Sequence, residues 1–123
     1  VTGFGLAGHA LEMARGARLH ILLRAEAVPV IAEAREFAAM GLLPAGSYAT
    51  RHYCGHLVAA ADGVDTLLMD LLFDPQTSGG LLLSIRPDQA EACVDRMRGR
   101  GIAEAAVVGE VAGAHETGLL SIE

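Results

Sequence analysis

The two apolar segments at the end of the chain limit its fold more than any other feature. Residues 105–111 and 119–122 are short and aliphatic, and Gly113 and Gly118 lie between them. Two short strands joined by residues that include glycine are typical of a hairpin, so we predict an antiparallel pair here. Helical and strand patterns mix in the preceding residues, and a terminal strand pair after them favours an α+β domain. We therefore expect a small mixed or antiparallel sheet packed with helices.

Apolar periodicity and chain-breaking residues predict the remaining elements. Helical spacing predicts helices over residues 6–15, 29–40, 65–73 and 87–98, and aliphatic runs predict strands over 19–23 and 81–85. Gly16 is expected to end the first helix, and Asp65 is expected to cap the third. Residues 42–56 contain Pro, Gly and Ser without a regular apolar period, so we predict an irregular segment there.

Length, charge and cysteine content narrow the class of protein. The 123 residues suit a single domain with one core, which we expect to span residues 1–123. The net charge of -6 and the scattered basic residues argue against a nucleic-acid partner. No apolar run reaches the ~18 residues that a membrane-spanning helix needs. Cys54 and Cys93 form no CxxC pair, so we expect no zinc site, two free thiols and a cytoplasmic protein.

The first motif is TGFGLAGH, residues 2–9. Glycines let a backbone turn tightly and approach a ligand. The start of the helix predicted to follow offers free N–H groups and a positive dipole end, which suit phosphate. Thr2, Gly3 and Gly5 are therefore candidates for binding a phosphate group. The alternative is that the glycines only allow the helix to pack closely.

The same glycines also fit a different kind of nucleotide site. Gly3, Gly5 and Gly8 match the G-x-G-x-x-G pattern of dinucleotide-binding folds, and Glu26 lies about where an acidic residue would bind the ribose. A fragment that binds a nicotinamide or flavin dinucleotide is therefore an alternative. It requires a parallel sheet with a strand that runs directly into Gly3.

The second motif is DPQTSGGLL, residues 74–82. Four side chains that form hydrogen bonds, Asp74, Gln76, Thr77 and Ser78, crowd one loop between a predicted helix and a predicted strand. Such density is more than a turn needs and favours a loop that lines a binding site. The alternative is a loop that satisfies itself, in which Asp74 and Thr77 cap the backbone.

With these two motifs the sequence resembles the C-terminal half of selenophosphate synthetases, which belong to the aminoimidazole-ribonucleotide-synthetase-like superfamily of ATP-using enzymes. The resemblance covers nearly the whole chain and includes the intervening residues 44–47 and 53–56. Residues 74–82 are its specific part, because relatives such as thiamine-monophosphate kinases share the glycine-rich helix entry but not that loop. Many members carry an Asn shortly after residue 47, where this chain has Thr50 and Arg51.

The resemblance implies an enzyme that makes selenophosphate from selenide, ATP and water, releases AMP and phosphate, and uses Mg²⁺. It implies that this chain is the C-terminal domain of a longer homodimeric protein, whose N-terminal domain holds the catalytic residues. The family's metal-binding Asp would directly precede Val1. We therefore expect no catalytic residue, metal ligand or bound cofactor in this fragment, and no turnover by the fragment alone. Another ATP-using member of the superfamily and a non-catalytic interaction domain are the alternatives.

Other polar side chains give weaker signals. His9, His52 and His56 have no Cys or carboxylate partner in register, so we interpret them as capping or packing residues. Asp70 and Asp74 stand four residues apart, and we interpret them as a solvated helix end. Neither cysteine is assigned a role.

Overall fold

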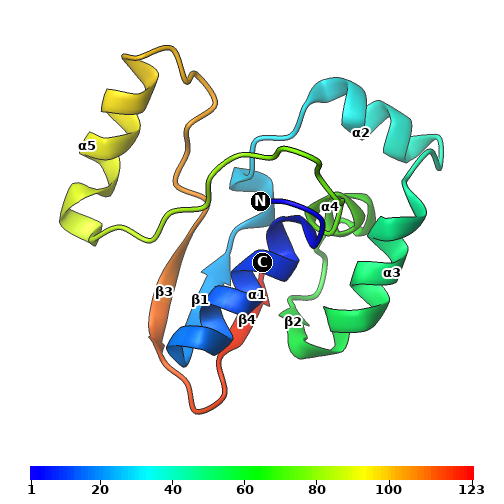
Figure 1. Cartoon of the computed structure of the whole chain (residues 1–123), viewed down its shortest axis with the longest axis horizontal. Coiled ribbons are helices and arrows are strands. Elements are labelled where there is room, and N and C mark those ends of the chain that lie inside the picture. The colour runs from blue at the N-terminus through cyan, green and yellow to red at the C-terminus, as the bar shows by residue number, and fades with distance from the viewer.

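The computed structural model describes all residues, 1–123, as a four-stranded sheet with helices around it (Figure 1). The helices are α1 (Gly5–Ala17), α2 (Ala32–Ala39), α3 (Ala45–Cys54), α4 (Thr66–Leu72) and α5 (Pro87–Arg98). The strands are β1 (Leu19–Leu23), β2 (Val58–Ala60), β3 (Gly109–Ala114) and β4 (Leu119–Ile122). Two 3₁₀ turns lie at Ala25–Ala27 and Gly55–Leu57. The predicted α+β class is confirmed.

The sheet is mixed, with strand order β2-β4-β1-β3. β1 pairs with β4 in parallel and with β3 antiparallel, and β4 pairs with β2 in parallel. The predicted hairpin is therefore wrong, because β1 lies between β3 and β4. Their connection crosses the start of β1, where the His115 N–H donates to the Arg18 carbonyl at 2.9 Å. Turn residues between two strands show only that the strands are neighbours along the chain. They do not show that β1, about ninety residues earlier, lies between the two strands in the sheet.

Other differences from the predicted elements have local causes. Helix α3 occupies most of residues 42–56, which we had predicted to be irregular. Its buried face consists of Ser47, Thr50 and Cys54, so no apolar period marks it in the sequence. Helix α1 continues through Gly16, and Arg18, in the left-handed conformation with φ 54°, ends it instead.

Residues 81–85 do not form the strand that their aliphatic composition predicted. Their backbone has no hydrogen-bond partner, and the Leu81 side chain is 87% exposed. Strand β3 also starts later than predicted, at Gly109 rather than at residue 105. A strand forms only where a neighbouring strand accepts its hydrogen bonds, and the outer edge of the sheet carries β3 over residues 109–114 only.

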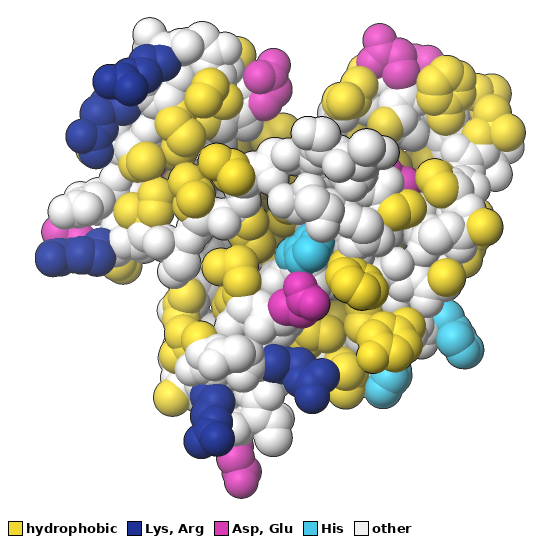
Figure 2. All heavy atoms as spheres, viewed as in Figure 1, with side chains coloured by type: hydrophobic (Ala, Val, Ile, Leu, Met, Phe, Trp, Pro, Cys, Tyr) yellow, Lys and Arg dark blue, Asp and Glu magenta, His cyan; other side chains and the backbone are white.

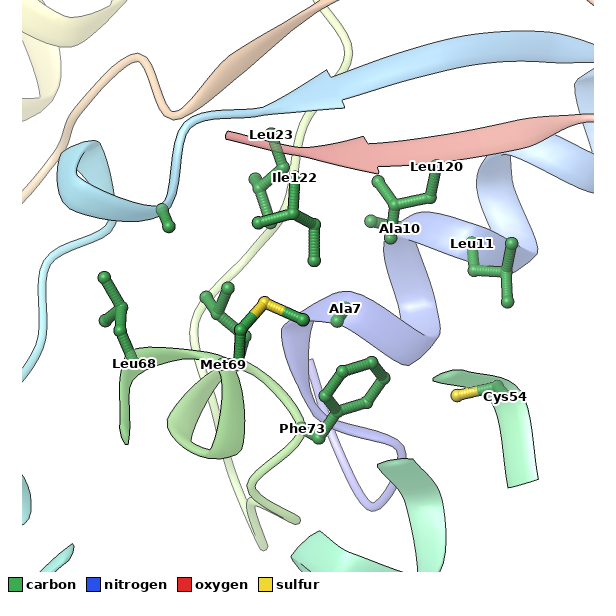
Figure 3. Close-up of a cluster of buried hydrophobic side chains, with 12 residues drawn as sticks. Ala7, Ala10, Leu11, Leu23, Cys54, Leu68, Met69, Phe73, Leu120 and Ile122 are labelled. Atoms are coloured by element: carbon green, nitrogen blue, oxygen red, sulfur yellow. The ribbon is translucent and has the colours of Figure 1, made fainter. Parts of the chain in front are cut away.

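The core lies between the sheet, α1 and α4. Helix α1 turns one face of small and aliphatic residues inward: Ala7, Ala10, Leu11 and Ala14. Figure 3 shows side chains from β1 and β4 pointing toward α4, and Phe73 lying close to α1. Phe73 is fully buried, and it directly follows α4. The core therefore fixes the C-terminal end of α4 beside the N-terminal end of α1.

Helix α5 stands apart from the rest of the molecule. Figure 1 shows it joined to the other elements by two long connecting segments. Val94 is its one buried residue. Figure 2 shows apolar side chains on the surface of this part, and Leu83 and Ile102 are each 52% exposed. No helix of the structure has both the length and the apolar character needed to cross a membrane.

The capping role predicted for Asp65 is confirmed and is open to a direct test. Its side chain accepts a hydrogen bond from the Leu67 N–H at 3.0 Å, which satisfies a free amide at the start of α4. We expect Asp65→Ala to lower the free energy of unfolding by about 1 kcal/mol in urea titration, since an N-cap contributes roughly that much. Asp62→Ala, in an exposed turn without such a bond, is the control. Equal effects of the two substitutions would contradict the capping role.

Candidate functional site

The two motifs meet in the structure. The Gln76 N–H donates to the Thr2 carbonyl at 3.1 Å, and the Gly79 N–H donates to the Val1 carbonyl, also at 3.1 Å. The Val1 amino group donates to the Gly80 carbonyl at 2.7 Å. The start of the chain and the loop of residues 74–80 therefore lie side by side, bonded backbone to backbone. We call residues 1–5 and 74–80 together the motif junction.

Gly5 explains how the two segments come so close. Its φ of 67° lies in the left-handed region, and a β-carbon there would lie 2.6 Å from the carbonyl carbon of Phe73. The Gly5 N–H also donates to the Thr2 carbonyl at 3.0 Å, which closes the turn before α1. The entry to α1 thus rests directly on the backbone at the end of α4. The loop that leaves α4 is thereby set against Thr2.

A chain of polar side chains runs along the start of α1. The Thr2 hydroxyl lies 2.9 Å from Nε2 of His9, and Nδ1 of His9 lies 2.8 Å from Oε2 of Glu12. The Phe4 ring meets the His9 ring edge to face, with centroids 5.9 Å apart. We had interpreted His9 as a residue without a carboxylate partner in register, and this is wrong, because Glu12 is that partner. His9 and Glu12 are three residues apart, a spacing at which helical side chains are neighbours, so that part was open to prediction.

Asp74 and the rest of the second motif lie in different surroundings. The Ser47 hydroxyl, buried in α3, donates to Oδ1 of Asp74 at 3.1 Å, so this carboxylate is held from within the chain. Thr77 and Ser78 are exposed, and no hydrogen bond forms from either side chain. Gln76 is half-buried, and its side-chain oxygen lies against Gly79. Asp74 is therefore held by α3 and not by its own loop, and neither Asp74 nor Thr77 caps the backbone as the alternative required. The side chains of Thr77 and Ser78 are exposed to solvent.

Two further residues named from the sequence are placed by α3. Arg51 forms an ion pair with Asp70, whose side chain is 15% exposed, so Asp70 is not the solvated residue that we had expected. Thr50 is buried and faces Gly8 of α1, where its methyl would lie 3.7 Å from a β-carbon. Thr50 therefore serves packing in this chain, and Arg51 forms an ion pair.

The junction offers donors rather than metal ligands. Helix α1 has no side-chain cap and no acidic residue in its first turn. Its first amide, that of Gly5, donates to the Thr2 carbonyl, and the positive dipole end of the helix is not offset by a carboxylate. No group of three or more His, Cys, Asp or Glu side chains is placed to hold a metal ion. Mg²⁺ needs about six oxygen ligands, several of them from carboxylates or phosphates. The residues of this chain do not fit a complete magnesium site.

Cys54 is a buried thiol with a perturbed acidity. Burial raises the pKa of the Cys54 thiol, and the nearby Glu12 carboxylate adds to that rise, while a backbone hydrogen bond opposes it. The thiol donates to the Thr50 carbonyl at 3.1 Å. A thiol with a raised pKa carries little thiolate at neutral pH, so Cys54 is a packing residue and not a nucleophile.

Thiol alkylation tests this assignment. At pH 8 we expect Cys93, which is partly exposed, to react with iodoacetamide at least about tenfold faster than Cys54, because thiolate content and access govern the rate. The Cys54 rate should continue to rise above pH 9, since its raised pKa delays thiolate formation. Peptide mass spectrometry gives both rates, and denaturation in urea should make them similar. Equal rates in the folded protein would contradict the burial of Cys54.

Comparison with known families decides what kind of domain this is. Residues 1–121 match the model of the family described as AIR synthase related protein, C-terminal domain. The chain belongs to this family. The mixed sheet and the family match together argue against the dinucleotide-binding alternative, which required a parallel sheet.

Several curated relatives of this chain are named selenide, water dikinase. The selenide, water dikinase of Clostridioides difficile is 43% identical over 111 residues, which cover 90% of this chain and 32% of that protein. Selenide, water dikinase 2 of Peptoclostridium acidaminophilum is 40% identical over 122 residues, or 99% of this chain and 35% of that protein. The selenide, water dikinase of Pelobacter propionicus is 46% identical over 111 residues, with coverage of 90% and 32%. The chain spans about a third of the length of these relatives.

Proposed function

We propose that this chain is the C-terminal domain of an enzyme that makes selenophosphate from selenide, ATP and water, with release of AMP and phosphate. The observation that carries the proposal is the similarity to selenide, water dikinases over 90% and 99% of the chain in two relatives. Residues 1–123 then form one domain of a longer protein. The nucleophile and most ligands of ATP belong to the part outside this chain.

The motif junction supports a specific role for the domain. The uncapped, positive dipole end of α1 and the exposed hydroxyls of Thr77 and Ser78 suit phosphate oxygens. A triphosphate carries several negative charges, which cations must neutralise during transfer. Since this chain lacks a complete magnesium site, Mg²⁺ would be held chiefly by carboxylates elsewhere in the protein. The domain would contribute one wall of the ATP site, next to the phosphates.

Partners and location follow from the same proposal. The domain would pack on its own N-terminal domain, in a cytoplasmic homodimer whose small-molecule substrates are ATP and selenide. The isolated 123-residue chain would bind ATP weakly and would turn nothing over. Tight, Mg²⁺-dependent ATP binding by this chain in a calorimetric titration would contradict that part of the proposal.

Phosphorus NMR of the reaction tests the proposed activity. The whole protein that carries this chain, given ATP, Mg²⁺ and selenide under reducing conditions, should release AMP and phosphate and show the signal of selenophosphate. Omission of selenide is the control and should abolish the selenophosphate signal. Steady formation of ADP without selenide would instead favour another ATP-using member of the superfamily.

A further inference from the structure

Three side chains at the start of α1 form a directed hydrogen-bond chain. Glu12 lies 2.8 Å from one ring nitrogen of His9, and Thr2 lies 2.9 Å from the other. We propose that Glu12 and His9 are positioning residues, which hold the Thr2 hydroxyl in one orientation with its proton directed at His9. This inference rests on the proposed function only in giving Thr2 a place beside bound ATP.

The chemistry of Glu12 and Thr2 determines which group donates in each of these two hydrogen bonds. An ionised Glu12 carboxylate only accepts hydrogen bonds, so Nδ1 of His9 must carry the proton that it receives. If the ring carries no second proton, Nε2 has a lone pair, and the Thr2 hydroxyl is then the group that donates to it. Thr2 is left with its oxygen lone pairs for any further partner. The hydroxyl is therefore available to a further partner as a hydrogen-bond acceptor, not as a donor to phosphate oxygens.

Neighbouring groups hold the hydrogen-bonded side chains in place. The Thr2 carbonyl accepts from both Gly5 and Gln76, so the backbone that carries the hydroxyl is fixed on two sides. The His9 side chain is 26% exposed and packs against the Phe4 ring. A β-carbon at Gly8 would lie 2.7 Å from the Phe4 β-carbon, so that glycine makes room for the packing. A side chain held by packing and hydrogen bonds keeps its geometry when a ligand arrives.

The tautomer of His9 tests the chain without reference to activity. Long-range ¹H–¹⁵N spectra of the whole protein with ¹⁵N-labelled histidine report which ring nitrogen carries the proton, and the spectrum of His9→Gln identifies the His9 signals. We expect the Nδ1–H tautomer, the less common one in free histidine. Glu12→Ala, at a 62% exposed side chain, should shift the ring toward Nε2–H. An Nε2–H ring in the unmodified protein, or a tautomer that Glu12→Ala leaves unchanged, would overturn the proposal.

A double-mutant cycle tests whether His9 acts through Thr2. We expect His9→Ala to lower kcat/KM for ATP about tenfold, but less than about twofold when Thr2→Val has already removed the hydroxyl, because residues that act as a unit are not additive. His9→Gln, whose side-chain oxygen can accept from Thr2, should recover part of the loss. His52→Ala, an exposed histidine on α3, is the control.

The outcomes separate this inference from the proposed function. The same loss from His9→Ala in both backgrounds would mean that His9 supports the fold alone, and would overturn the inference. If the whole protein forms no AMP from ATP, the proposed function fails, but the tautomer measurement still decides the positioning chain. If His9→Ala does not fold, Glu12→Ala carries the test, because its side chain lies largely in solvent.

Discussion

Gly5→Ala is expected to lower the free energy of unfolding by about 3 kcal/mol. The φ of 67° costs an L-residue about 1–2 kcal/mol, and forcing a methyl group into a packed site costs about 1–3 kcal/mol more. The added carbon would meet main-chain atoms of Leu72 and Phe73 at 2.6 to 2.9 Å. Backbone cannot rotate away as a flexible side chain would, so α1 and α4 must separate. Urea unfolding of the chain, followed by circular dichroism, measures the loss.

Gly3→Ala is the matched control for Gly5→Ala. It lies two residues earlier in the same motif, and no atom lies within 4 Å of a β-carbon built there. We expect Gly3→Ala to change the free energy of unfolding by no more than about 0.5 kcal/mol, as for most open surface positions. If the two substitutions were equally mild, α1 would not rest on the end of α4 as described.

Gly79→Ala is expected to lower kcat/KM for ATP in the whole protein by about tenfold or more, with a smaller effect on stability. A β-carbon at this position would lie 2.7 Å from the Val1 carbonyl oxygen and 2.3 Å from the side-chain oxygen of Gln76. The Gln76 side chain can move, but the Val1 backbone cannot do so cheaply, so the bond from the Gly79 N–H to Val1 is lost. A displacement of about 1 Å at a substrate-positioning loop is enough for an effect of this size.

Gly80→Ala is the control within the same loop. No atom lies within 4 Å of a β-carbon at Gly80, and its carbonyl remains free to accept from Val1. We expect kcat/KM for ATP of Gly80→Ala to stay within about twofold of that of the unmodified enzyme, since a methyl group at an open position does not displace the loop. Steady-state rates of AMP release at varied ATP give both values. A larger loss from Gly80→Ala than from Gly79→Ala would contradict the close contact of the two motifs.

Local signals in the sequence predicted the elements that local chemistry determines. Asp65 caps α4 and Pro87 opens α5, as expected, because each needs only its own first turn. Helix α3 escaped prediction because its buried positions hold Ser47 and Thr50 rather than aliphatic residues. Its burial depends on what lies opposite, in α1 and in the loop after α4, and that information is not local.

Strand pairing was the part that the sequence could not supply. Gly113 and Gly118 signalled a reversal of the chain, and β3 and β4 do run in opposite directions, but each pairs with β1 instead of with the other. Conversely, residues 81–85 have strand composition and no partner. The composition of a segment indicates whether it favours the strand conformation. Whether it joins the sheet also depends on an unpaired strand edge within its reach.

The sequence predicted two separate motifs, residues 2–9 and 74–82, but not that they lie side by side in the fold. That Thr2 would lie against Gln76, seventy-four residues later, follows from the packing of α1 on α4, which no spacing in the sequence reveals. The bond from Ser47 to Asp74 has the same long-range origin. The pairing of His9 with Glu12 is different, because a helix brings residues three apart together. We had interpreted His9 as lacking a carboxylate partner, although Glu12 stands at that spacing on the same helix.

Amide hydrogen exchange tests most directly that the two motifs together face the nucleotide. The whole protein is compared with and without a non-hydrolysable ATP analogue and Mg²⁺. We predict slower exchange in residues 2–8 and in residues 76–80, with no change in α5, which stands apart from both. Protection of α5 alone, or no protection in either motif at saturating analogue, would contradict the placement of the ATP phosphates at the motif junction.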